Sequence, residues 1–176
     1  MSTWVAFLRG INLGKRQMKM AELKTCCEAM GLENVKTIVA SGNVRFDTKK
    51  DTGLKTRLEK ALEDTFAFPV KVILRSSDEM EKMIASRPFA KVDPKADVAL
   101  HVLLFADPMK TRPKVAPVEG DYEAARIDDD AIFFIVYKKL DGTYLGRSAL
   151  GDVLKPMEKA HLVTMRNWNT MLKLLA

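Results

Sequence analysis

Apolar runs and helical stripes alternate with polar turns along the first half of the chain. Residues 4–9 form an apolar run that ends in a glycine-containing loop, which is typical of a buried strand. Residues 23–30 carry apolar side chains at helical spacing and predict a helix that ends at Gly31. Residues 35–40 and 44–46 flank the turn Ser41-Gly42-Asn43, so they predict a β-hairpin.

The first half closes with a second helix and a fourth strand. Apolar side chains share one face of a helix over residues 54–66, and residues 70–74 predict a strand. The order is therefore βαββαβ, the ferredoxin-like arrangement, in which strand three returns between strands one and two. The end of strand one and the turn before strand three then share one edge of the sheet. We expect Arg9-Gly10-Ile11-Asn12 to lie beside Ser41-Gly42-Asn43 at that edge.

A helix and a connecting segment are expected at residues 77–98. Residues 78–85 predict the helix, with Ser77 as its N-cap and Glu81 completing a capping-box-like pattern. The two prolines within residues 87–97 mark the boundary between the halves.

The second half has a similar order of elements, without a repeat at the level of residues. Its predicted elements are a strand at 99–105, a hairpin of 122–127 and 131–137, a helix over 150–159 that Pro156 could break, a short strand at 162–164, and a last helix with Trp168, Met171, Leu172 and Leu175 on one face. The sequence therefore predicts an α+β fold of two ferredoxin-like halves with antiparallel or mixed sheets, residues 1–76 and 99–176.

The composition adds few constraints. The 176 residues are 47% hydrophobic and 30% charged, as in globular proteins, and no apolar run approaches the ~20 residues that span a bilayer. The only cysteines, Cys26 and Cys27, are adjacent and provide no disulfide framework, which favours the reducing cytoplasm. The net charge of +6 is compatible with an anionic ligand or nucleic acid, but it also serves solubility alone.

Five motifs in a fixed order resemble one known family. They are Leu8-Arg9-Gly10-Ile11-Asn12-Leu13-Gly14, Lys19-Met20-Ala21-Glu22-Leu23, Val39-Ala40-Ser41-Gly42-Asn43-Val44, Gly146-Arg147-Ser148 and Thr164-Met165-Arg166-Asn167-Trp168-Asn169-Thr170. The chain resembles, over nearly its whole length, the bacterial family of uncharacterised proteins called domain of unknown function 1697. The resemblance implies a small α+β fold of two ferredoxin-like halves, and it implies no established activity.

The loop Gly10-Ile11-Asn12-Leu13-Gly14-Lys15-Arg16 lies between a predicted strand and a predicted helix. That context suits a phosphate-binding loop, in which backbone N–H groups and a lysine contact oxygens. The loop is not a Walker A motif, because its glycine spacing is one residue short and Arg16 replaces the Ser/Thr. The alternative is a flexible loop whose glycines satisfy backbone geometry.

Two segments of the second half open helices in the same way. In Arg166-Asn167-Trp168, Asn167 is a good N-cap, and Arg166 either binds an anion or makes an internal salt bridge. In Gly146-Arg147-Ser148, Ser148 is the expected N-cap.

No other pattern carries an identifiable chemistry. Asp128-Asp129-Asp130 is interpreted as a hairpin turn, and His101 and His161 as structural residues, because no second histidine stands at metal spacing. We therefore expect no metal and no cofactor, and no catalytic base can be identified, so enzymatic activity stays open.

The favoured hypothesis is a cytoplasmic protein that binds an anionic small molecule, such as a phosphorylated metabolite or nucleotide, at the junction of its two halves. The predicted site residues are Arg9, Asn12, Ser41, Asn43, Arg147, Arg166 and Asn167. The alternatives are a nucleic-acid-binding module, which the RRM-like fold class and charge allow, and a structural or interaction protein with no ligand. No membrane partner is expected, and the oligomeric state stays open.

Overall fold

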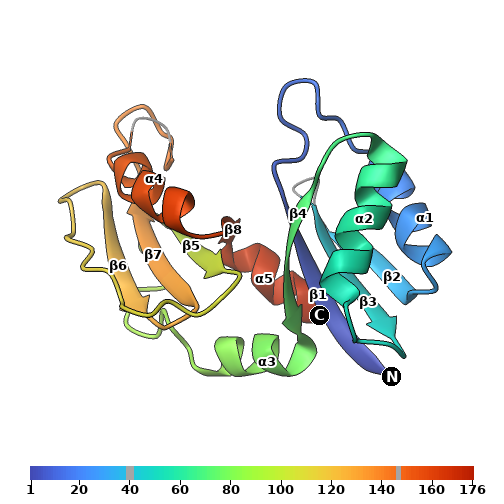
Figure 1. The fold of residues 1–176 in the computed structure, drawn as a ribbon. Coiled ribbons are helices and arrows are strands. Elements are labelled where there is room, and N and C mark those ends of the chain that lie inside the picture. The colour runs from blue at the N-terminus through green and yellow to red at the C-terminus, as the bar shows by residue number, and fades with distance from the viewer. Residues whose placement is uncertain (39–41, 146–147) are drawn as a thin grey trace. The chain divides into compact units, whose positions relative to one another are not determined.

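The computed structural model describes residues 1–38, 42–145 and 148–176. The protein is α+β, with two four-stranded antiparallel sheets (Figure 1). It forms two compact units: Met1–Lys82 together with Leu172–Ala176, and Met83–Met171.

The first unit is a sheet with two helices on one face. Its elements are β1 (Ser2–Arg9), α1 (Met20–Ala29), β2 (Glu33–Ile38), β3 (Asn43–Thr48), α2 (Leu54–Phe66) and β4 (Lys71–Ser76), followed by α3 (Ser77–Ala85). The strand order is β2-β3-β1-β4, so the two central strands are β1 and β3. Figure 1 shows α1 and α2 side by side over this sheet.

The central part of strand β1, residues 4–8, is continuously apolar because both of its faces are buried. Ala6 and Leu8 belong to the core beneath α1 and α2. The alternate residues Val5 and Phe7 point to the opposite face and are also fully buried. This two-sided burial explains why the sequence shows a continuous apolar run in place of a polar–apolar alternation.

The helices of the first unit follow their sequence signals closely. Helix α2 has the predicted bounds and buries Leu54, Leu58 and Leu62, one residue per turn. Helix α3 has a capping box on residues other than those predicted. The pair is Ser76 and Glu79: the Ser76 N–H donates to Glu79 Oε2 at 2.7 Å, and the Glu79 N–H donates to Ser76 Oγ at 3.3 Å.

The second unit is a sheet with the order β6-β7-β5-β8. Its elements are β5 (Val98–Phe105), β6 (Tyr122–Ile127), β7 (Ala131–Tyr137), α4 (Leu150–Ala160) and β8 (Val163–Asn167), followed by α5 (Trp168–Leu175), whose last residues from Leu172 belong to the first unit. Strands β6 and β7 have the predicted bounds and pair as the predicted hairpin around residues 128–130. Helix α4 continues through Pro156 without the break that the proline suggested.

Each face of the second sheet has its own apolar cluster. Phe134 and Leu103 pack with residues of α4 in the core. On the opposite face, Phe133 lies edge-on to both Phe89 and Trp168, with ring centroids 5.8 Å apart in each case. This aromatic cluster attaches the segment after α3 and the start of α5 to the sheet.

Candidate functional site

The loop between β1 and α1 begins beside the β2–β3 turn, as the topology predicted. Phe7 pairs with Asn43 in the β1–β3 ladder, and the Leu8 N–H donates to the Gly42 carbonyl at 2.8 Å. Gly42 has a φ of +76°, and a Cβ there would stand 3.0 Å from Leu8 Cβ. Position 42 therefore accepts only glycine without displacing its neighbours.

The predicted asparagines of the first unit stabilise the local backbone. Asn12 has a φ of +53°, and its Oδ1 accepts the Met18 N–H at 2.7 Å, which ties together the two ends of the loop. Asn43 is fully buried, and its Nδ2 donates to the Ile38 carbonyl at 2.9 Å. Both amide groups therefore hydrogen-bond to the backbone of their own loop or turn.

The charged side chains of the same loop lie differently. Arg9 is half-buried at the end of β1, opposite Lys71 of β4. Lys15 and Arg16 are exposed at the tip of the loop. Among the residues that the structure describes, Lys15 has no hydrogen-bond or ion-pair partner, and the Arg16 guanidinium only lies over the Phe68 ring, 6.0 Å from its centroid.

In the second unit, Arg166 is a buried cation. Only 8% of the residue is exposed, and its Nη1 donates to Thr164 Oγ1 at 2.7 Å and to the Met165 carbonyl at 2.8 Å. Burial lowers the pKa of the Arg166 guanidinium to about 10, so the group remains charged at neutral pH. Asn167 is the N-cap of α5, as predicted, because its Oδ1 accepts the Asn169 N–H at 2.9 Å.

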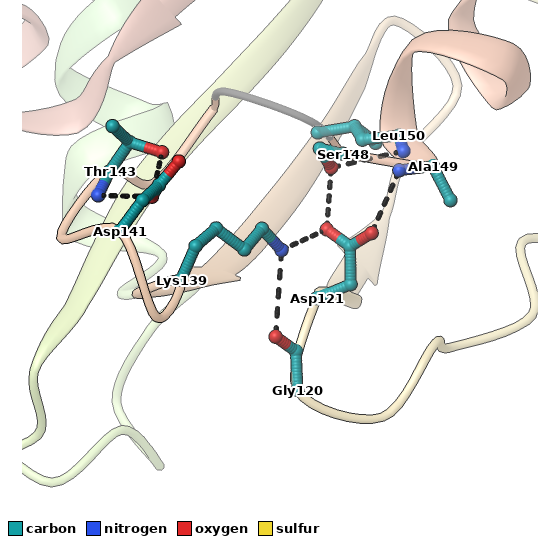
Figure 2. Close-up of polar contacts among 8 residues, drawn as sticks. All are labelled: Gly120, Asp121, Lys139, Asp141, Thr143, Ser148, Ala149 and Leu150. Carbon is teal, nitrogen blue, oxygen red and sulfur yellow. Dashed lines mark hydrogen bonds and ion pairs between the residues drawn. The ribbon is translucent and has the colours of Figure 1, made fainter.

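Ser148 belongs to a polar cluster at the start of α4, which Figure 2 shows. Ser148 Oγ accepts the Leu150 N–H at 3.1 Å and donates to Asp121 Oδ1, which also accepts from Lys139 Nζ. Asp121 Oδ2 accepts the Ala149 N–H at 2.8 Å. The Ser148 hydroxyl therefore uses its proton and one of its two lone pairs within the cluster, and we infer a structural role for it.

Asp121 is the electrostatic centre of this cluster. Its side chain is 13% exposed and that of Lys139 is 15% exposed. Burial acts to raise the Asp121 pKa, but the hydrogen bonds from Lys139, Ser148 and the Ala149 N–H outweigh it and hold that pKa below its ordinary value. The sequence indicated no special role for Asp121 or Lys139, because no local pattern connects Asp121 to α4, which begins 29 residues later in the chain.

Two of the predicted site residues, Ser41 and Arg147, lie outside the described residues. The structure brings Arg9, Asn12 and Asn43 to one edge of the first unit, and Arg166 and Asn167 to adjacent positions in the second. The predicted convergence of both sets at a common site stays a prediction.

Other reactive side chains show no activated state. Burial, together with the charges of Cys26 and Glu28, raises the pKa of the Cys27 thiol to about 12, so it stays protonated. His101 is buried on β5, and burial lowers its pKa. Across residues 1–38, 42–145 and 148–176, no group of three His, Cys, Asp or Glu is placed to hold a metal, and no helix is long and apolar enough to cross a membrane.

Comparison with known proteins places this α+β fold in a family. The chain belongs to the family of proteins of unknown function DUF1697, whose model matches residues 1–133. No curated protein matches the chain. The solved structure of the conserved bacterial protein SP0830 from Streptococcus pneumoniae is similar, with a TM-score of 0.73 and 21% identity over 99% of this chain and 96% of that one. This similarity shows the fold alone.

Proposed function

We propose that the protein binds an anionic small molecule through the loop at residues 9–19, which we call the basic loop. The observation that carries this proposal is the pair Lys15 and Arg16, two exposed cations whose side chains make no hydrogen bond or ion pair with the described residues. The first acidic residue of the chain is Glu22, so no carboxylate within the loop competes for these charges.

The basic loop is also held in shape before any ligand arrives. Ile11 and Met18 are buried at 6% and 3% exposure, and the Asn12 hydrogen bond to the Met18 N–H connects the two ends. Gln17 Nε2 donates to the Gly14 carbonyl at 3.0 Å within the tip. A loop whose conformation is already fixed loses less entropy on binding, which favours affinity.

The chemistry of these groups favours phosphate or carboxylate. Arginine and lysine donate charge-assisted hydrogen bonds, which are roughly twice as strong as neutral ones. Arg9 lies at the base of the same loop and completes the set in the first unit. The predicted contribution of Arg147, Arg166 and Asn167 requires the two units to come together, and it remains part of the proposal.

Nucleic-acid binding through an RRM-like surface has less support. Such modules stack bases on aromatic side chains exposed on their central strands. Phe7, Phe46 and Phe133, which lie on the central strands β1, β3 and β7, are fully buried. A nucleotide remains compatible with the proposal as a small phosphorylated ligand.

We also propose that both units are ferredoxin-like and that the protein works in the cytoplasm. The order β2-β3-β1-β4 with α1 and α2 on one face supports this assignment for the first unit. The order β6-β7-β5-β8 supports it for the second, where an irregular segment over residues 106–121 replaces the first helix. Two cysteines that are free and buried support a reducing compartment.

A thermal-shift panel tests the ligand proposal. The panel contains sugar phosphates, nucleoside phosphates and inorganic pyrophosphate, each paired with its uncharged counterpart. We expect stabilisation by phosphorylated members only, because ligand binding to the native state raises the melting temperature.

The variant Lys15→Ala/Arg16→Ala is expected to weaken that binding about tenfold. The matched control removes two exposed lysines of the same unit, Lys36→Ala/Lys55→Ala, and is expected to bind as the wild type does. Steep salt-dependent RNA binding in place of these shifts would favour the nucleic-acid alternative.

A further inference from the structure

The second unit contains a cavity of about 610 Å³ that none of the predicted site residues touches. It lies between residues 87–98, which follow α3, and the strands β6 and β7. Every lining residue belongs to the second unit, so the cavity is complete within that unit. Its volume falls in the range of small-molecule sites, roughly 300–1,000 Å³.

Several of the residues that line this cavity are apolar. Ile135 of β7 is 8% exposed, and Val98, Ala124 and Phe89 also line the space. Phe89 is held in place by its edge-on contact with Trp168, at 5.4 Å between ring centroids. An apolar portion of a ligand would be removed from water here, which is favourable.

Most charged groups around the cavity already have partners. Glu123 accepts a hydrogen bond from the Tyr137 hydroxyl at 3.0 Å, and Asp93 accepts one from the Lys95 N–H at 2.9 Å. The Arg126 Nη2 donates to Ser86 Oγ at 2.7 Å and pairs with a carboxylate of the hairpin turn. Each of the two carboxylates therefore has a neutral hydrogen-bond donor, and Arg126 has an ion-pair partner.

Two cations at the cavity have no such partners. Arg87 and Lys91 are exposed lining residues, and neither side chain has a hydrogen-bond or ion-pair partner among the residues that the structure describes. Arg126 is paired with Asp128, a carboxylate outside the lining, so the unpaired cations of the lining are Arg87 and Lys91. Two unpaired cations beside apolar lining residues are complementary to a ligand with a single anionic group and an apolar body.

We propose that this cavity is a second binding site, which takes a small hydrophobic carboxylate with its anionic group at Arg87 and Lys91. The proposal does not rest on the basic loop. In this site the apolar body of the ligand contacts Ile135 and Phe89, and its carboxylate contacts the two cations.

The experiment is an NMR titration of the ¹⁵N-labelled protein with phenylacetate and octanoate, each against 2-phenylethanol and phenethylamine. We expect the carboxylates to shift amides of residues 87–98, β6 and β7, and the alcohol and amine to bind at least about tenfold more weakly. Arg87→Gln/Lys91→Gln should weaken carboxylate binding about tenfold, because each charge-assisted contact is lost. The charge-reversed Arg87→Glu/Lys91→Glu should transfer the preference to phenethylamine.

Lys15→Ala/Arg16→Ala serves as the control, because it removes the same charge from the other unit and should leave these shifts unchanged. Failure of the basic-loop proposal therefore leaves this result intact, and the reverse also holds. Equal binding of the alcohol and the carboxylate would overturn the proposal. Unchanged affinity in the Arg87/Lys91 variants would also overturn the proposal. The same holds if neither carboxylate causes shifts at tens of millimolar, a concentration at which weak fragments still bind.

Discussion

Gly42 lies against Ile11 so closely that position 42 has no room for a side chain. A Cβ there would stand 3.2 Å from Ile11 Cγ1 and 3.0 Å from Leu8 Cβ. This contact connects the β2–β3 turn to the base of the basic loop, and it does so within the first unit.

Gly42→Ala is therefore expected to lower the free energy of unfolding by more than the cost of placing alanine at a positive φ. Gly31 provides the matched control, because its φ of +78° is almost the same as the +76° of Gly42 and nothing lies within 4 Å of its Cβ position. We expect Gly31→Ala to cost ~1 kcal/mol and Gly42→Ala about 2 kcal/mol more, from overpacking. Urea unfolding measures both, and equal losses for the two variants would contradict the close contact.

Asn12→Ala should destabilise the basic loop. The change leaves the Met18 N–H without its 2.7 Å acceptor and puts alanine at a φ of +53°. The expected loss in the free energy of unfolding is about 1–3 kcal/mol. Asn12→Asp retains the acceptor and should keep most of that stability. If the alanine variant unfolds at the same urea concentration as the wild type, the hydrogen bond does not hold the loop.

Asp121→Asn should lower the free energy of unfolding by about 3 kcal/mol at pH 7, because it leaves Lys139 largely buried without its anion. Asp141→Asn is the control. Asp141 lies in an exposed loop, where it accepts the Thr143 N–H at 2.9 Å, and its loss should cost ~1 kcal/mol or less.

The same pair has a pH signature. The folded-state pKa of Asp121 is lower than its ordinary value, so its contribution is present above about pH 4 and disappears as the pH falls through the folded pKa. The stability difference between the wild type and Asp121→Asn should therefore shrink between pH 5 and pH 2. A difference that stays constant over this range, measured by urea unfolding at several pH values, would show that the Asp121 charge contributes nothing.

Cys26 and Cys27 should resist alkylation in the native protein. Cys27 is 1% exposed with a thiol pKa of about 12, and Cys26 is 7% exposed with its Sγ 3.3 Å from Thr65 Oγ1. Mass spectrometry after iodoacetamide treatment at pH 8 should detect label only when urea is present. Labelling of either thiol within minutes in native buffer would assign it a reactive role that the geometry does not support.

The sequence indicated most elements because their periodicity was unambiguous. Leucines at 54, 58 and 62 define a single helical face, and residues 131–137 are apolar at every position that the second sheet buries on either face. The last helix was harder, because residues 171–175 contain apolar side chains at four of five positions. Leu172 was expected on the buried face but is 41% exposed, whereas Leu174 is fully buried.

The site was only partly predictable, because its decisive contacts are not local. The position of Leu8 and Ile11 beside Gly42 followed from topology, since strand order determines which loops share an edge. The hydrogen bond between Asn12 and Met18 depends on the path of the whole loop, so it left no signal in the spacing. The carboxylate of Asp121 accepts hydrogen bonds at the start of α4, far along the chain. The cations Arg87 and Lys91 line a cavity together with β6 and β7, and the spacing of residues in the sequence does not indicate that cavity.

A titration of the ¹⁵N-labelled protein with inorganic pyrophosphate tests most directly whether the basic loop binds anions. We predict saturable shifts in the amides of residues 10–19, their loss in Lys15→Ala/Arg16→Ala, and their retention in Lys36→Ala/Lys55→Ala. Shifts that persist when Lys15 and Arg16 are removed, or the absence of shifts in this loop at millimolar pyrophosphate, would contradict it.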